Sequence, residues 1–314
     1  MTVIFFGSSE FSIAALKACL DFPLRILKVI TTPDRKKGRG LKEMPTPVRI
    51  FAEERKLPVA APENLKSGEL IQEIQNLKPE LFVVSSYGKI IPSAWLKIPS
   101  RYSLNVHPSL LPKHRGAAPV NWPILNGEKE TGLSIADITN RLDAGDLFYQ
   151  KKISIEPQDD SQILTSKLAA LSCDALKSLF EKIKNGETLN RTPQNEAQSS
   201  YARKLSKEDG QIQWTKSAEE IWNQSRGLVP WPSASFVFQN ETVQILKSRV
   251  ESAEAKSIPG KIIKIQKEGP VFIQTGNGIL ALETLKPSGK KEMSAAEFIR
   301  GRRLAEGSML GENR

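Results

Sequence analysis

The chain contains only two histidines, His107 and His114, so any histidine chemistry must use one of them. Asn105 lies two residues before His107, at the end of a short apolar run that is typical of a β-strand. Because side chains alternate along a strand, both residues would point to one face of a sheet. An amide donor and a proton-transferring imidazole would then face a ligand beyond the strand end. A capping asparagine with a structural loop histidine is the alternative.

A second apolar run, residues 133–138, leads to Asp143 in the turn sequence NRLDAGD. Acidic residues beside glycine usually form solvated turns, but a buried carboxylate here would orient His107 and stabilise its protonated form. No serine or cysteine nucleophile is indicated, because Gly-x-Ser-x-Gly is absent and neither Cys19 nor Cys173 lies near a histidine in sequence. Two cysteines and two histidines also leave no plausible zinc ligand set.

These residues need a sheet to position them, and strand and helix signals alternate through the first part of the chain. This alternation predicts an α/β fold with a mostly parallel sheet that is covered by helices. Strands are expected over residues 3–6, 24–31, 81–84, 104–106 and 133–138, and helices over 47–56, 67–77 and 163–183. The first turn, Gly7-Ser8-Ser9, lacks the later glycines of a dinucleotide fingerprint, so NAD binding is poorly supported.

The composition of the chain changes after residue 184. Residues 184–200 are polar, contain Pro193 and are interpreted as an interdomain linker. Short strands are then expected over 235–238, 242–247, 260–265, 271–274 and 279–285, and helices over 218–224 and 295–303. This pattern predicts a small barrel or sandwich. The predicted organisation is a catalytic domain of residues 1–188, a linker of residues 189–206 and a β-rich domain of residues 207–314.

The net charge is +10 over 314 residues, which fits either a nucleic-acid partner or a merely basic surface. The densest local charge lies in residues 32–49, where glycines alternate with the basic residues Arg35, Lys36, Lys37, Arg39 and Lys42. Such a loop suits phosphate contact, and a solvated basic loop is the alternative. Neither a signal peptide nor a membrane span is indicated, so a cytoplasmic protein with reduced cysteines is expected.

The combined motifs resemble the signature of the 10-formyltetrahydrofolate-dependent formyltransferases. The resemblance is carried by NVH at residues 105–107, PSLLPKHRG at residues 108–116 and LDAGD at residues 142–146, in that order. It implies a Rossmann-like catalytic domain, no metal and 10-formyltetrahydrofolate as co-substrate. It also implies catalytic roles for Asn105, His107 and Asp143, and folate contacts from Ser109, Leu110, Leu111 and Pro112.

Three further segments resemble the tRNA-directed members of that family. They are KGRG with MPTP at residues 37–47, RGLVPWP at residues 226–232, and MSAA with GRR at residues 293–303. They imply an OB-like second domain, methionyl initiator tRNA as partner, a role in translation initiation, and tRNA contacts from Lys37, Arg39 and Lys42. A monomer is expected. Leu41, Ser86 and Lys89 depart from the family pattern, but none of them is a predicted catalytic residue.

Three other functions remain open at this stage. A related formyltransferase could act on a small amine such as an amino sugar or a purine precursor, although the basic loop and the second domain favour tRNA. A related hydrolase would use water as the acceptor. A non-catalytic RNA-binding protein on an α/β scaffold would have no need of Asn105, His107 and Asp143 together.

Overall fold

The computed structural model describes residues 1–37, 42–251 and 257–311. The chain forms two compact units. The first unit contains Met1–Pro119, Thr131–Ser154 and Thr165–Arg203. The second contains Val120–Glu130, Ile155–Leu164 and Lys204–Arg314.

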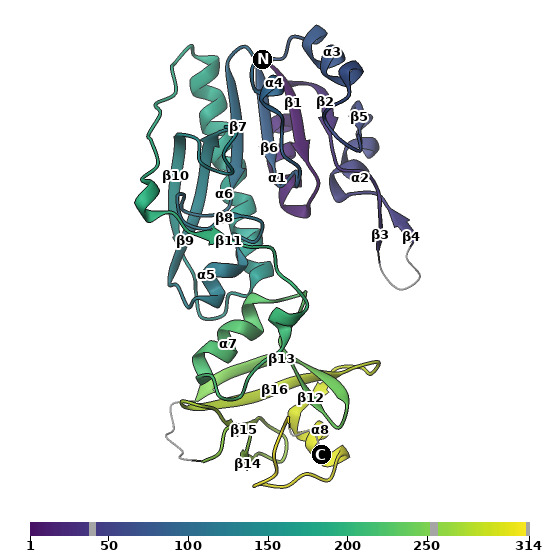
Figure 1. Ribbon diagram of the computed structural model, residues 1–314, viewed down its shortest axis with the longest axis vertical. Coiled ribbons are helices and arrows are strands. Elements are labelled where there is room, and N and C mark those ends of the chain that lie inside the picture. The colour runs from purple at the N-terminus through teal and green to yellow at the C-terminus, as the bar shows by residue number, and fades with distance from the viewer. Residues whose placement is uncertain (38–41, 252–256, 312–314) are drawn as a thin grey trace. The chain divides into compact units, whose positions relative to one another are not determined.

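The first unit is built on a seven-stranded sheet in the order β10-β9-β7-β6-β1-β2-β5 (Figure 1). Its strands are β1 (Thr2–Gly7), β2 (Arg25–Ile30), β5 (Val59–Ala60), β6 (Leu81–Ser85), β7 (Tyr102–His107), β9 (Glu130–Asp137) and β10 (Leu147–Ser154). The five strands from β7 to β5 pair in parallel, and β9 runs antiparallel to β7. The predicted mostly parallel α/β sheet is confirmed. β10 was not predicted from the sequence, because the second half of this strand is largely polar.

Helices cover this sheet. They are α1 (Glu10–Asp21), α2 (Pro47–Glu54), α3 (Gly68–Asn76), α4 (Ser93–Leu96) and α6 (Ser161–Lys184). α1 begins at a capping box in which Ser9 and Ser12 satisfy each other's backbone N–H groups. α1 and α6 lie together, because Phe22 packs on Phe180 and Lys177 pairs with Asp21. No helix in the described part of the chain is long and apolar enough to cross a membrane.

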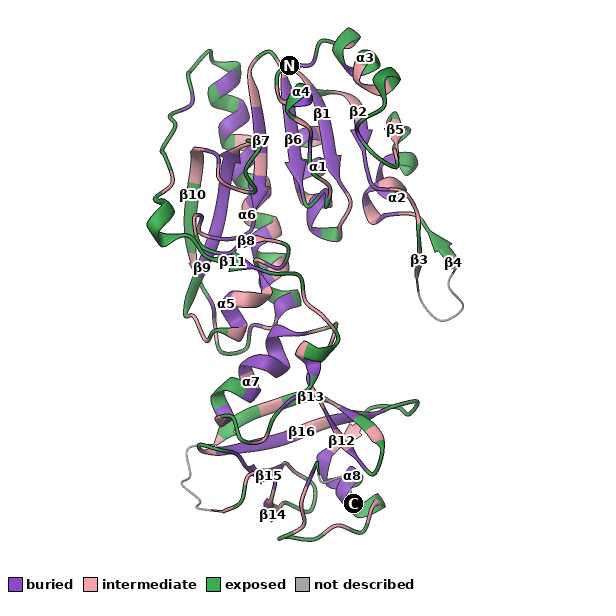
Figure 2. Ribbon diagram, in the orientation of Figure 1, coloured by how far each residue is buried: buried purple, intermediate pink, exposed green. Residues whose placement is uncertain are grey.

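Alternation along the central strands sorts their side chains between the two faces of the sheet. Figure 2 shows β1 and β6 as almost entirely buried. Ile4 and Phe6 point to the face that α3 and α4 cover, where they pack with Phe82 and with the fully buried Trp95. This cluster fixes the register of β1 against β6, because a slip by one residue would exchange the two faces. The same register places the carboxyl ends of β1, β6 and β7 next to one another at one edge of the sheet.

Two short pairs of strands lie outside the main sheet. β3 (Arg35–Lys37) and β4 (Lys42–Met44) form an antiparallel hairpin that projects from the sheet beyond α2 (Figure 1). An ion pair between Arg49 and Asp34 holds the base of this hairpin, with Nη1 3.0 Å from Oδ1. β8 (Arg115–Gly116) pairs in parallel with β11 (Tyr201–Ala202). β11 belongs to the segment that the sequence analysis interpreted as a linker.

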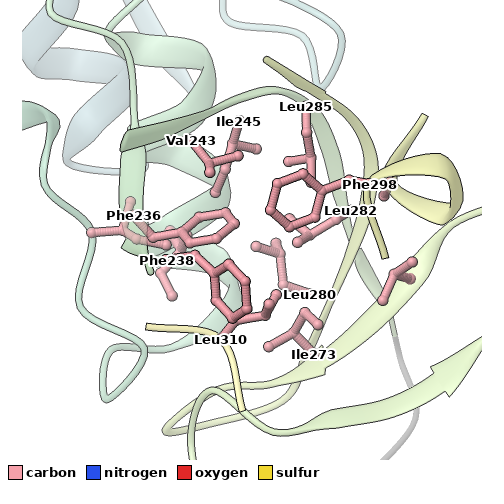
Figure 3. Packing of buried hydrophobic residues seen from close by; sticks show 14 of the residues in the cluster. Phe236, Phe238, Val243, Ile245, Ile273, Leu280, Leu282, Leu285, Phe298 and Leu310 are labelled. Carbon is pink, nitrogen blue, oxygen red and sulfur yellow. The ribbon is translucent and has the colours of Figure 1, made fainter. Parts of the chain in front are cut away.

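The second unit is β-rich, as predicted. Its antiparallel sheet has the order β12-β13-β16-β15-β14, with β17 paired to β16. Its elements are α5 (Asn121–Leu125), α7 (Ala218–Gly227), β12 (Ser235–Phe238), β13 (Glu241–Glu251), β14 (Ile262–Ile265), β15 (Val271–Gln274), β16 (Ile279–Pro287), β17 (Met293–Ser294) and α8 (Ala295–Gly301). Two single turns of 3-10 helix, Glu196–Gln198 and Glu208–Gly210, lie in the first and second unit respectively. Figure 3 shows Phe298 of α8 directed into the core against Phe236 and Phe238.

A buried guanidinium explains why residues 155–164 belong to the second unit. Arg226 of α7 is 8% exposed and donates to the backbone carbonyls of Glu156 and Asp159. Its other donors meet Oδ1 of Asn223 at 3.1 and 2.8 Å, and its charge lies 4.3 Å from the centre of the Trp222 ring. Burial lowers the pKa of Arg226, so these acceptors offset part of its desolvation cost.

Tyr87 offers a test of the packing around β6. Its hydroxyl is buried without a hydrogen-bond partner among the described residues, and burial raises the pKa of the phenol to about 12. The unfolded chain would ionise first, near pH 10, so stability is lost as the pH rises from about 10 to about 12. We therefore expect Tyr87→Phe to be as stable as the parent protein at pH 8 and about 1.4 kcal/mol more stable at pH 11.

Urea unfolding at both pH values measures this difference, and Tyr201→Phe, at an exposed tyrosine, is the control. A loss of more than about 1 kcal/mol in Tyr87→Phe at pH 8 would contradict the expectation, since it would reveal a stabilising partner for the hydroxyl.

Candidate active site

Asn105 and His107 lie at the carboxyl end of β7. β7 runs between β6 and β9, where Asn105 pairs with Val84 on one side and with Ala136 on the other. Asn105 is half-buried, and His107 is 5% exposed. The two side chains share one face of the sheet, since they are two residues apart on a strand. That position is where open α/β sheets bind their ligands.

Asp143 reaches both side chains from the loop that joins β9 to β10. Its Oδ1 accepts a hydrogen bond from Nδ2 of Asn105 at 3.0 Å, and its Oδ2 accepts one from the backbone N–H of Gly116 at 2.9 Å. Oδ2 also lies 3.7 Å from Nδ1 of His107. The Asp143 side chain is only 10% exposed, so protein groups hold both oxygens. The structure thus brings the three predicted catalytic residues together.

A backbone carbonyl orients the imidazole ring. Nε2 of His107 lies 2.9 Å from the carbonyl oxygen of His114. Since a carbonyl oxygen can only accept, Nε2 carries a hydrogen, and the neutral ring holds its lone pair on Nδ1. That lone pair faces Asp143. The His114 carbonyl, and not Asp143 alone, therefore sets the ring orientation, and a proton that arrives at Nδ1 meets a carboxylate.

The catalytic loop, defined as residues 139–146, has an unusual backbone. Asp143 has a φ of 50°, in the left-handed region that costs most residues about 1–2 kcal/mol. Aspartate tolerates this region better than bulkier residues do. Gly145 has no space for a side chain, because a Cβ there would lie 2.0 Å from the carbonyl oxygen of Asp137. The path of the chain thus requires a glycine at position 145, and aspartate is compatible with the backbone conformation at position 143.

The four predicted folate-contacting residues form a supported turn beside His107. The Ser109 hydroxyl donates to the carbonyl of Lys113 at 2.7 Å. Ser134 of β9 donates to the Ser109 carbonyl and accepts from the Leu111 N–H, and Gln150 of β10 donates to the Leu111 carbonyl. Leu111 is buried, whereas Leu110 and Pro112 are half-buried. The turn is rigid on its sheet side, and contact with folate stays a prediction.

Buried hydroxyls at the end of β6 add polar character to the same edge. Ser85 lies level with Val106 of β7 and Gly7 of β1. Its hydroxyl has no hydrogen-bond partner among the described residues, and nor has that of Tyr87 two residues later. Buried polar atoms without partners are uncommon in folded proteins, and these two lie at and just beyond the carboxyl end of β6. Ser85 was not predicted from the sequence, although a serine that ends a buried strand at this edge was the available signal.

Residues 191–202, called here the supporting segment, pack against the catalytic loop. Leu147, immediately after the loop, exchanges two backbone hydrogen bonds with Thr192, and β11 pairs with β8 beside the Gly116 N–H that binds Asp143. This role was not predicted from the sequence, because the segment is polar and its partners lie 45 or more residues away along the chain. It therefore lacks the apolar periodicity that reveals packed elements.

The predicted tRNA-contacting residues lie apart from these groups along the chain. Lys37 ends β3 and Lys42 begins β4, and the two residues pair across the hairpin. Arg39 falls outside the described residues. The described residues contain no group of acidic, histidine or cysteine side chains that could hold a metal ion.

Comparisons with known proteins agree with this architecture. Residues 1–179 match the family model described as formyl transferase, and residues 204–303 match that of the formyl transferase C-terminal domain. Fold and site together define an α/β transferase with an added β-rich domain. The chain belongs to the formyl transferase family.

Curated relatives match almost the whole chain. A methionyl-tRNA formyltransferase of Alkaliphilus oremlandii is 39% identical over 312 residues, which cover 99% of this chain and 100% of the relative. One of Geobacter metallireducens is 38% identical over 99% of both chains. The crystal structure of an N-formyltransferase from Helicobacter canadensis, in complex with folinic acid and dTDP-3-aminofucose, has a TM-score of 0.67 at 21% identity. That match covers 89% of this chain and 98% of the other, and it shows a shared fold.

Gly116 allows the support of Asp143 to be tested. Its φ is 114°, and an added Cβ would lie 2.6 Å from the Tyr201 ring and 2.8 Å from the Ala202 carbonyl oxygen. We expect Gly116→Ala to displace the N–H that binds Asp143 and to lower turnover about 10-fold or more, since small misplacements in an active site are costly. Formyl-transfer rates measure the effect.

Gly186→Ala is the matched control, because Gly186 also has a positive φ, 81°, but no atom within 4 Å of an added Cβ. Equal turnover in the two variants would show that the Gly116 contact does not matter for the site.

Proposed function

We propose that this protein transfers the formyl group of 10-formyltetrahydrofolate to the α-amino group of methionyl initiator tRNA, for translation initiation. The observation that carries the proposal is the convergence of Asn105, His107 and Asp143 at the carboxyl end of β7. Curated relatives named methionyl-tRNA formyltransferase that match over nearly the full length support the same acceptor.

The acceptor amine needs little help to become nucleophilic. A free α-amine has a pKa near 8, so a usable neutral fraction exists at pH 7. The amine attacks the formyl carbon, a C–N bond forms, and negative charge develops on the formyl oxygen. The bond to the folate nitrogen then breaks, and that nitrogen needs a proton while the new amide must lose one. The site therefore has to stabilise an oxyanion and move a proton.

Asn105 is placed to stabilise the developing oxyanion. Its side-chain amide has two N–H groups, and Asp143 Oδ1 accepts only one of them. The other is available to the formyl oxygen. Asp143 fixes the plane of the amide before substrate binds, which is the preorganisation that makes such a donor effective. One donor of this kind typically lowers the barrier by about 3–4 kcal/mol.

His107 and Asp143 provide the proton path. Nε2–H of His107 is committed to the His114 carbonyl, so Nδ1 is the nitrogen that exchanges protons. Nδ1 lies 3.7 Å from Asp143 Oδ2, close enough for the carboxylate to stabilise the imidazolium that forms when the ring takes the amine proton. His107 then returns the proton to the leaving nitrogen, and no metal is required.

The donor substrate fits the polar edge around β6 and β7. Ser109, Leu110, Leu111 and Pro112 form the turn beside His107 that we propose to contact folate. Bound there, the folate supplies an activated formyl group, and the protein contributes position and charge stabilisation.

The acceptor tRNA requires contacts beyond this edge. We propose that residues 1–188 form the catalytic domain, that residues 189–206 are a linker whose residues 191–202 also pack on the catalytic loop, and that residues 207–314 form a domain that helps to hold tRNA. Arg39, Lys37 and Lys42 would contact the acceptor end through its phosphates, which arginine and lysine suit. A cytoplasmic monomer is part of this proposal.

The first experiment is transfer of radiolabelled formyl from 10-formyltetrahydrofolate to methionyl initiator tRNA. We expect label on the tRNA with the parent protein, and turnover lowered by about 100-fold or more in Asn105→Ala, His107→Ala and Asp143→Ala. Asn105→Leu is the sharper variant, because it keeps the approximate shape, removes the donor and sets no new charge against Asp143. Free methionine and an amino sugar are the alternative acceptors to compare.

Loss of formyl from folate without label on tRNA would move the acceptor to a small amine or to water. Parent-like turnover in all three alanine variants would overturn the assigned site.

A second prediction concerns the basic hairpin. Replacing Lys37, Arg39 and Lys42 together by alanine should raise the KM for tRNA about 10-fold or more, while the KM for 10-formyltetrahydrofolate stays within about twofold, since phosphate contacts act only on the nucleic acid. The salt dependence of tRNA binding should also become shallower. Replacing Lys182, Lys184 and Lys151, which lie elsewhere on the first unit, is the matched control for lost charge. Equal effects in the two triple variants would contradict a specific role for the hairpin.

A further inference from the structure

Gln194 lies in the supporting segment, and its side chain faces the catalytic loop. We infer that Gln194 is a positioning residue for formyl transfer, whose amide holds the backbone on either side of Ala144 so that Asp143 stays within reach of Asn105 and His107. The inference rests on the proposed function, because it assigns to Gln194 a role in the same reaction.

The Gln194 amide bridges two carbonyls of the loop. Nε2 donates to the carbonyl oxygen of Asp143 at 2.8 Å and to that of Gly145 at 2.7 Å. Both N–H groups are thus used, and each ends on the loop backbone. Two donors from one planar group fix the distance between these carbonyls and, with it, the turn between the residues.

A guanidinium fixes the orientation of that amide. Oε1 of Gln194 accepts from Nη2 of Arg115 at 2.7 Å and from Nε at 3.2 Å. A guanidinium only donates and a carbonyl only accepts, so the amide cannot be turned over without losing all four bonds. Arg115 is 8% exposed, and the next residue in the chain, Gly116, donates its N–H to Asp143 Oδ2.

Glu196 links Arg115 to the catalytic loop through a second arginine. Its carboxylate accepts from Nη1 and Nη2 of Arg115 at 3.1 and 2.9 Å, and from Nη2 of Arg141 at 2.6 Å. Arg141 belongs to the catalytic loop. Hydrogen bonds from Arg115 and then from Arg141 lower the pKa of Glu196 to about 2, so it remains a carboxylate at any working pH.

The same segment also supports the histidine side of the site. The Ser200 hydroxyl accepts from the His114 N–H at 2.9 Å, and the Ser200 carbonyl accepts from the Arg115 N–H at 2.9 Å. The His114 carbonyl in turn receives Nε2–H of His107. The groups that contact Asp143 and His107 are therefore both held by residues 191–202.

The catalytic loop needs this external support. Asp143 and His114 both have positive φ, 50° and 58°, and such residues persist only where the surroundings over-determine them. Leu142 beside Asp143 is 56% exposed, so apolar packing does not hold the loop there. Hydrogen bonds from the supporting segment supply the constraint instead.

The test compares Gln194→Met and Gln194→Glu with Gln198→Glu. Gln194→Met keeps the length of the side chain without its donors, and Gln194→Glu sets a carboxylate against the two carbonyls. The Gln198 side chain is exposed in the same segment. Radiolabelled formyl transfer to methionyl tRNA under single-turnover conditions gives the rate, and steady-state assays give the KM for each substrate.

We expect the two Gln194 variants to lose about 10- to 100-fold in turnover, with both KM values within about twofold, since displaced catalytic groups affect the chemical step. Gln198→Glu should match the parent protein. Parent-like turnover in Gln194→Met and Gln194→Glu would overturn the inference, and so would equal losses in turnover and folate affinity.

Combination with Asp143→Asn separates positioning from general stability. If Gln194 acts through Asp143, adding Gln194→Met to Asp143→Asn should lower the rate by less than about twofold further. Multiplied losses would instead assign Gln194 an independent structural effect and overturn the inference. Absence of formyl transfer by the parent protein would contradict the proposed function, which distinguishes that failure from failure of the positioning role.

Discussion

The position of the Asp143 carboxylate is the constraint on which the site depends. One oxygen holds the amide of Asn105, and the other meets the Gly116 N–H and faces His107. A single carboxylate therefore positions both the proposed oxyanion donor and the proposed proton carrier. To reach this position, Asp143 adopts a left-handed backbone conformation, which is strained for a residue other than glycine. It also lies on a loop and not on a strand.

The rest of the first unit can be understood as support for that carboxylate. β7 fixes Asn105 and His107 through its pairing with β6 and β9, and the packed face under α3 and α4 fixes the register of the strands. The catalytic loop has no comparable core. Gln194 and the carboxylate of Glu196 hold it through hydrogen bonds. These hydrogen bonds fix the loop, whereas apolar packing fixes the strands.

Much of the fold follows from local pattern. The α/β class, the β-rich second part and most of the longer strands and helices were predicted, because buried strands and amphipathic helices each have their own periodicity. β10 was missed because it lies at the edge of the sheet, where lysines and a glutamine replace the apolar residues of a central strand. The short pairing of β8 with β11 was missed because two residues carry no periodicity.

The sequence by itself singled out the candidate catalytic residues: Asn105, His107 and Asp143 were predicted from residue type, spacing and family resemblance. Only the tertiary structure decided how they are oriented. It gave the His107 ring its partner in the His114 carbonyl, and it turned residues 191–202 from an expected linker into the support of the catalytic loop. The physical reason is that hydrogen bonds between polar residues far apart in the chain leave no periodic trace in the sequence, whereas burial of apolar surface does.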